Sequence, residues 1–287
     1  MISLRHWFIP ALGGLVLTSA SAAEIGVATI VDGNVRTLRG ASWYKLVAGA
    51  SIEEGDIVEV ADRGQAQIEL PGGTLVNLAR GTSYVVPAAP KASPAGPPAL
   101  VVPSGWVKAV VKAPGLRVRT TTSEVVVATG NIVVHADAPR LEAFVEAGRA
   151  RLVALNANGS EASVHEGKQD EFWSTSASGA FVPSTRPPKP FIDAMPRHFL
   201  DPLPALAGKF KTRVALVRDR DVSYAEAQPW LAGRDRVVFE RRFASRLSDP
   251  AFRKAVEPDV ARYPSWDRRL HPEKYAPPTP VKPAAAR

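Results

Sequence analysis

The sequence of 287 residues contains no cysteine. This excludes disulfides, thiolate metal sites and cysteine nucleophiles, and it also excludes a lipoprotein that is acylated on cysteine. The motifs of zinc proteases, nucleophile elbows and phosphate-cradling loops are absent as well. Histidine is scarce, and the four histidines that follow the N-terminal segment are far apart in sequence, with no pair at metal-ligand spacing: His135, His165, His198 and His271. We therefore expect no catalytic residues, no metal and no cofactor.

Long hydrophobic runs are also lacking. Arg5 precedes an apolar run of about ten residues that starts at Trp7, which is short of the roughly 18–20 residues that span a bilayer. Ala20-Ser21-Ala22 then matches the A-x-A pattern of a signal-peptidase site. We expect residues 1–23 to be a signal peptide cleaved near Ala22-Ala23, and the mature chain to be periplasmic with no transmembrane span. An uncleaved anchor helix is the alternative.

Positive charge is concentrated in the last third of the chain. Residues 24–184 hold 14 Lys and Arg against 16 Asp and Glu, whereas residues 185–287 hold 21 against 12. Seven basic residues form a cluster that is a candidate polyanion-binding patch: Arg234, Arg236, Arg241, Arg242, Arg246, Arg253 and Lys254. Arginine suits bidentate contact with phosphate or carboxylate. The alternative is a solvated helix face, because acidic residues are interspersed with these basic ones.

The basic patch indicates the kind of partner to expect. In the periplasm nucleic acid is not a candidate, so the partner would be an envelope protein or an anionic envelope polymer. Lipopolysaccharide, lipid headgroups and wall glycan are the polymers with suitable charge.

Short strands with turn signals dominate residues 24–174. In the run Ala66–Leu70, alternation places Ala66, Ile68 and Leu70 on one apolar face and the polar side chains of Gln67 and Glu69 on the other face. Pro71-Gly72-Gly73 predicts a tight turn. Further strands are expected at Trp106–Val111, Leu116–Thr121, Val125–Ala128, Ile132–His135, Glu142–Val145 and Arg151–Leu155.

Proline marks the boundaries of these segments. Residues 87–104 hold a dense group of prolines and are expected to be an exposed loop inserted in the β domain. Residues 175–204 are a proline-rich linker, 205–276 a helical basic extension, and 277–287 a disordered tail. The fold class is therefore mainly β, with a small α-helical part after the linker.

Helix signals begin after residue 222. Ser223 and Glu226 have the spacing of a capping box. Arg234–Leu247 is the strongest helix candidate, with Phe239, Phe243 and Leu247 on one face. Asp249-Pro250 predicts the start of another helix.

The order of glycines and apolar residues resembles the FecR domain, a periplasmic domain named after an iron-citrate signalling regulator. The matching positions are Gly33, Val35, Gly49, Ile52, Gly55, Asp56, Val58, Gly64, Ala66, Ile68, Leu70, Gly73, Thr74, Val76 and Leu78. Ser104–Val107 and Leu116–Thr120 continue the pattern, whereas Val127–Val134 departs from it. The resemblance spans roughly residues 25–173, and it implies a solenoid-like or roll-like all-β domain.

Regulators of this family are anti-sigma factors with a cytoplasmic part and a membrane span, and in this chain we expect only a signal peptide in their place. The resemblance therefore predicts a non-enzymatic binding or interaction module of the cell envelope. One alternative is a component of iron- or siderophore-type signalling that contacts an outer-membrane transporter or a membrane sensor. A lesser alternative is an envelope hydrolase with an unrecognised site.

Overall fold

The computed structural model describes residues 23–86, 97–176, 179–233 and 235–275. Most of the expected signal peptide (1–23), residues 87–96 of the expected loop, Arg234 and the expected tail (277–287) lie outside the described residues. The later part of that loop, from Ala99 onward, belongs to a long strand.

The described chain is mainly β, as the sequence predicted, and ends in a small helical part. The strands are β1 (Glu24–Asp32), β2 (Val35–Arg39), β3 (Ser42–Lys45), β4 (Ser51–Glu53), β5 (Ile57–Glu69), β6 (Leu75–Val86), β7 (Ala99–Val111), β8 (Leu116–Arg119), β9 (Ser123–Asp137), β10 (Arg140–Leu155), β11 (Glu161–Lys168), β12 (Phe172–Thr175), β13 (Phe181–Ser184) and β14 (Val217–Asp221). The helices are α1 (Lys189–Ala194), η1 (Arg197–Phe199), η2 (Ala207–Lys209), α2 (Tyr224–Leu231), α3 (Arg236–Phe243), η3 (Ala244–Ser248), α4 (Pro250–Val256), η4 (Glu257–Arg262), α5 (Pro264–Leu270) and η5 (Pro272–Tyr275).

All these strands form one mixed sheet. Its order is β13-β12-β10-β9-β8-β7-β6-β5-β2-β3-β14, while β1 pairs with β4 and β5, and β11 pairs with β10. Only the β7–β8 pair is parallel among the described strands. No pairing between described strands joins the two ends of this path, so the sheet is not closed into a barrel. The finer solenoid-like or roll-like description stays a prediction.

The long strands change partners part-way along their length. β5 pairs with β2 over Ile57–Val60 and with β1 over Gln65–Glu69. The breaks in β6, β7, β9 and β10 coincide with the glycines Gly81, Gly105, Gly130 and Gly148. A Cβ on Gly81 would lie 2.3 Å from the Ser104 carbonyl oxygen, so the backbones approach too closely for any side chain.

These breaks correct part of the sequence prediction. Val125–Ala128 and Ile132–His135 are not separate strands but two halves of β9, on either side of Gly130. Glu142–Val145 and Arg151–Leu155 are likewise two halves of β10. Gly130 and Gly148, which resemble turn residues in the sequence, therefore lie at β-bulges within continuous strands and not at strand ends.

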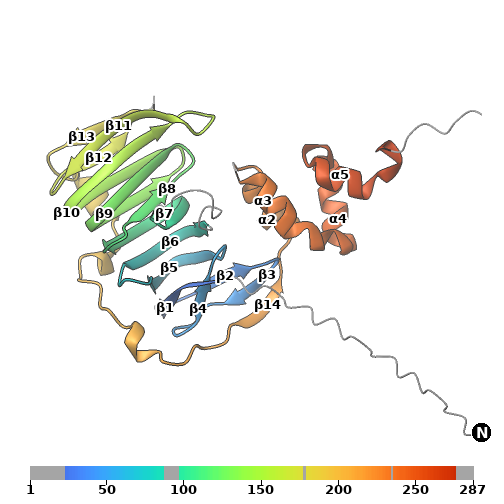
Figure 1. The fold of residues 1–287 in the computed structure, drawn as a ribbon, viewed down its shortest axis with the longest axis horizontal. Coiled ribbons are helices and arrows are strands. Elements are labelled where there is room, and N and C mark those ends of the chain that lie inside the picture. The colour runs from blue at the N-terminus through green and yellow to red at the C-terminus, as the bar shows by residue number, and fades with distance from the viewer. Residues whose placement is uncertain (1–22, 87–96, 177–178, 234, 276–287) are drawn as a thin grey trace, which may run out of the picture.

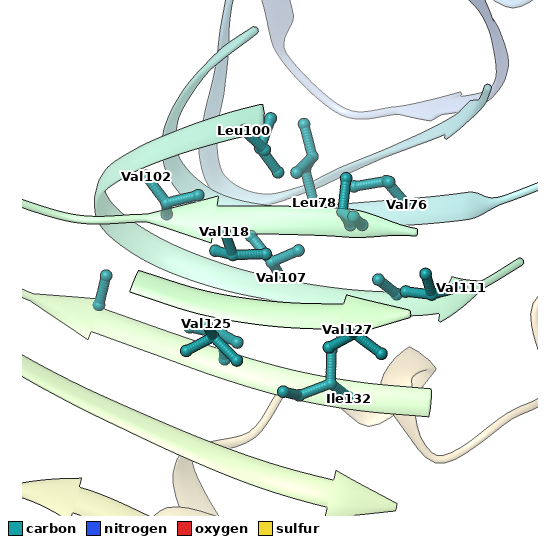
Figure 2. Close-up of a cluster of buried hydrophobic side chains, with 14 of the residues drawn as sticks. Val76, Leu78, Leu100, Val102, Val107, Val111, Val118, Val125, Val127 and Ile132 are labelled. Carbon is teal, nitrogen blue, oxygen red and sulfur yellow. The ribbon is translucent and has the colours of Figure 1, made fainter. Parts of the chain in front are cut away.

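The main core lies on the inner face of the bent sheet. Figure 2 shows Leu100 and Val102 from the first half of β7, and Val107 and Val111 from its second half, among the buried side chains. All of them belong to one buried cluster that also contains Ile68 from β5. Ile68 is 2 % exposed, which confirms its predicted place on the apolar face.

The C-terminal third wraps around the sheet. We call residues 187–214 the strap; in Figure 1 it runs from β13 below the sheet to β14, which pairs with β3. Phe191, Met195 and Phe199 of the strap pack on the outer face of the sheet, in a cluster that includes Trp106 and Phe172. Apolar anchors in a proline-rich segment thus cover sheet surface that would otherwise face water.

The strap also explains why the polar face of β5 is not in solvent. Gln67, which is fully buried, donates from Nε2 to the Pro204 carbonyl at 2.7 Å. Glu69 Oε2 accepts the backbone N–H groups of Leu206 and Ala207 at 3.0 and 2.8 Å. Alternation places these two side chains on the face opposite Ile68, but it cannot reveal a covering segment 137 residues away.

Helices α2 and α3 lie beside β2 and β3, and α4 and α5 lie farther from the sheet (Figure 1). Leu38, Trp43 and Ile57 of the sheet share a buried cluster with residues of these helices, among them Phe243 and Trp266. Trp43 is 2 % exposed and Trp266 is 1 % exposed. None of the helices in the described ranges combines the length and the apolar character needed to cross a membrane.

Candidate anion-binding surface

The described residues of the basic patch lie on α3, η3 and α4, and two helix starts in this part of the chain follow local sequence signals. The Ser223–Glu226 capping box is present at the start of α2, as predicted. Asp249 accepts the Ala251 N–H and caps α4, also as predicted. The expected helix 234–247 is shorter than predicted: α3 covers Arg236–Phe243, and a 3-10 turn follows it.

Arg242 is used to attach the helices to the sheet. Its guanidinium donates to three backbone carbonyls around the β2–β3 turn and the β4–β5 turn: Gly40 at 2.6 Å, Gly55 at 2.5 Å, and Leu38. The guanidinium also lies 5.7 Å from the ring centres of Phe239 and Phe243. Because its donors are committed to carbonyls, Arg242 has little capacity left for an external anion.

Arg246 is also committed within the fold. It donates to the Val222 carbonyl at 3.1 Å, and it forms ion pairs with Asp221 at 2.9 Å and Asp249 at 2.5 Å. Its guanidinium lies 5.5 Å from the Phe252 ring centre. Arg246 therefore joins the end of β14 to η3 and α4.

Arg236 is exposed and pairs with Glu240, one helical turn later, at 3.1 Å. It also donates to the Arg262 carbonyl at 3.1 Å. Glu240 is 5 % exposed and accepts from Ser265 at 2.6 Å, so this ion pair is part of the packing of α3 against α5.

Of the six described residues of the patch, three remain as exposed cations. Arg241, Arg253 and Lys254 are exposed, and within the described part of the chain their side chains form no hydrogen bond or ion pair. Arg253 and Lys254, together with Pro250 and Glu257, line a hollow of about 400 Å³ at the surface of α4. These three side chains keep their donors available to an anion from outside.

The ion pair that orients α2 has a pH consequence. Arg220 donates to both carboxylate oxygens of Glu226, at 2.7 and 2.8 Å. This hydrogen bond to the Arg220 guanidinium, aided by the Ser223 N–H and hydroxyl, lowers the pKa of Glu226 to about 2. Burial raises the pKa of Tyr224, whose hydroxyl bonds to Tyr263 and Asp259.

The sequence did not point to a second group of cations. Arg63, Arg80 and Arg197 line one hollow, although the last is more than a hundred residues from the other two. Two of them lie at strand bends and the third lies in the strap. In the sequence, the only indication of bulges at these arginines is that Gly64 follows Arg63 and Gly81 follows Arg80.

Comparisons with known proteins add little to this geometry. No protein-family model matches the chain, and no curated protein matches it. Two crystal structures of a protein provisionally described as an anti-sigma factor, from Parabacteroides distasonis ATCC 8503, are similar in part, each with 18% sequence identity and a TM-score of 0.37. The similarity covers 45% of this chain and 59% of each of those chains, so this chain spans less than two thirds of their length.

Proposed function

We propose that this chain is an exported, non-enzymatic binding module of the bacterial cell envelope whose partner is an anionic envelope surface or polymer. The proposal rests on one observation: Arg241, Arg253 and Lys254 are exposed without a described partner, on helices that Arg242 and Arg246 attach to the sheet. Cations that are held in place and not neutralised locally attract polyanions at low ionic strength. The N-terminal signal pattern supports the location.

The anchoring contacts show which arginines a binding test must leave intact. Arg242 and Arg246 hold the helices on the sheet through carbonyl and carboxylate contacts. Substituting them would alter folding as well as charge, so loss of binding in such variants would be ambiguous. Arg241, Arg253 and Lys254 carry no such contact in the described residues, and their replacement by glutamine removes charge alone.

The test is co-sedimentation of the mature chain with lipopolysaccharide, phosphatidylglycerol vesicles and wall fragments at two salt concentrations. We expect binding that weakens as salt is raised, because the Debye length falls from about 10 Å at 0.1 M to about 3 Å at 1 M salt. The triple variant Arg241→Gln, Arg253→Gln, Lys254→Gln should lose most of it. A matched triple variant on the sheet, Arg140→Gln, Arg149→Gln, Lys168→Gln, should keep it. Equal losses in the two triple variants would contradict a specific patch.

A signalling component is the second candidate, and it rests on the resemblance of residues 25–173 to the FecR pattern. It predicts that removal of the chain from its host changes the transcript level of an outer-membrane transporter. Transcript profiles of strains with and without the chain test this. Identical profiles, under conditions where the chain is produced, would count against it.

A further inference from the structure

A hollow of about 500 Å³ lies where the sheet bends beneath the strap. It is lined by residues of β5, β6 and β7 and by strap residues of α1, of η1 and between them, among them Arg63, Arg80, Arg197 and His198. A volume of this size is in the range of small-molecule sites. The contacts described above do not use the three arginine side chains of this hollow.

The strand bends determine where two of these arginines lie. The β5–β6 register shifts between Val60 and Gln65, and Arg63 lies within this break at a φ of +63°. Arg80 lies between Ala79 and Gly81, where the β6–β7 register shifts. Bulges redirect side chains, and a left-handed backbone at a residue other than glycine is uncommon and is found preferentially at functional sites.

Charge in the hollow is mostly unbalanced. Arg63 and Arg197 are exposed and have no ion pair with any described residue, while Arg80 has only a long contact of 3.8 Å to Asp62. Both members of that contact are largely exposed, at 68% and 83%. Such a pair contributes little, so Asp62 offsets the charge of Arg80 only weakly.

His198 adds a polar group without a partner. Its Nε2 is buried and has no hydrogen-bond partner among the described residues. Burial lowers the pKa of His198, although the nearby Asp201 opposes this. A buried polar nitrogen without a partner is unfavourable.

We propose that this hollow binds a phosphate-bearing ligand of about the size of a sugar phosphate. A phosphate monoester carries nearly two negative charges and three acceptor oxygens, which suits a hollow that is lined by three arginines from different segments. Ala79, Ala194 and Pro196 would contact the carbon part of the ligand. This site lies on β5, β6, β7 and the strap, and is therefore separate from the basic patch on α3 and α4 and independent of the function proposed above.

The test is isothermal titration of the full mature chain with glucose 6-phosphate, with glucose and glucuronate as neutral and carboxylate comparisons. We expect glucose 6-phosphate to bind and glucose not to bind. Arg63→Gln, Arg80→Gln and Arg197→Gln should each weaken binding about tenfold, the effect of losing one charge-assisted hydrogen bond. Arg149→Gln, which removes an exposed arginine beside another bulge glycine, should leave affinity unchanged.

Vesicles that contain phosphatidic acid distinguish a lipid headgroup from a soluble phosphate. If these vesicles bind and the three arginine variants bind the vesicles less, the site is supported and the phosphate is that of a lipid headgroup. If glucose 6-phosphate binds in this arginine-dependent way and the vesicles do not, the site is supported and the phosphate belongs to a soluble ligand. No binding of either probe at millimolar phosphate would overturn the proposal, and so would glucuronate binding as tight as that of glucose 6-phosphate. An equal loss in Arg149→Gln would show non-specific attraction and overturn it as well. The triple variant of Arg241, Arg253 and Lys254 should bind glucose 6-phosphate normally, which separates this result from the proposed function.

Discussion

Replacement of Arg242 by glutamine should destabilise the whole described fold, whereas replacement of the adjacent Arg241 should not. Arg242 donates to the carbonyls of Leu38, Gly40 and Gly55, while the Arg241 side chain is exposed with no described partner. The two substitutions remove the same charge from neighbouring positions of α3. Their comparison therefore isolates the attachment to the sheet from the change in net charge.

The magnitude follows from the contacts. A hydrogen bond to a charged group contributes about 1.5–3 kcal/mol when buried, and contributions at one side chain do not add fully. One of the three bonds is at the exposed surface and two are partly buried. We therefore expect Arg242→Gln to lower the free energy of unfolding by about 2–3 kcal/mol, and Arg241→Gln to change it by less than about 0.5 kcal/mol.

The assay is urea unfolding followed by tryptophan fluorescence, which reports on Trp43 and Trp266 in the cluster between helices and sheet. Arg242→Gln should shift the midpoint to lower urea with an unchanged slope. Equal midpoints for the two variants would refute the view that this guanidinium attaches the helices. A separate early transition for the helices in the wild-type chain would show instead that they form an independent extension.

Three further predictions follow from the described contacts. Glu69→Lys should lower the free energy of unfolding by about 1–3 kcal/mol because it removes the acceptor of two strap N–H groups, and Ile68→Asp should lower it further because it buries an unpaired carboxylate. Urea midpoints test both variants, and an unchanged midpoint for Glu69→Lys would contradict the contact with the strap. Gly81→Ala should prevent or severely weaken folding because the added Cβ would lie 2.3 Å from the Ser104 carbonyl oxygen, whereas a Cβ at Gly208 has nothing within 4 Å and Gly208→Ala should hardly change the melting temperature. Similar melting temperatures for the two variants would argue against the close backbone approach at Gly81. The folded-state pKa of Glu226 is about 2, below its ordinary value, so the stability that its carboxylate contributes is fully present above about pH 4.5 and is lost as the pH falls through about 2. The difference in unfolding free energy between wild type and Glu226→Gln should therefore shrink over that range, and a difference that grows on acidification would contradict the lowered pKa.

Local chemistry explains which parts of the fold could be predicted from the sequence. The Ser223 capping box, the Asp249 cap and the turn at Pro71-Gly72-Gly73 each involve residues a few positions apart, and the structure contains all three. The inward position of Ile68 follows from strand alternation in the same way. Such features depend on backbone geometry that a short segment determines by itself.

The remaining features depend on contacts between distant segments. Arg242 bonds to carbonyls 187 to 204 residues earlier, and Gln67 to a carbonyl 137 residues later. A basic cluster in the sequence cannot show which of its arginines are committed to such carbonyls. In the same way, a glycine such as Gly130 reads as a turn until its partner strand shows that the ladder continues on both sides.

Hydrogen exchange of the mature chain, with and without bound anionic vesicles, tests the central claim most directly. The claim is that exposed cations on the anchored helices form the docking surface for an anionic envelope partner. We predict slower exchange of backbone amides in α3 and α4, residues 236–256, on binding, and no change in β8 and β11 on the sheet. Unchanged exchange in residues 236–256, while the vesicles are demonstrably bound, would contradict it.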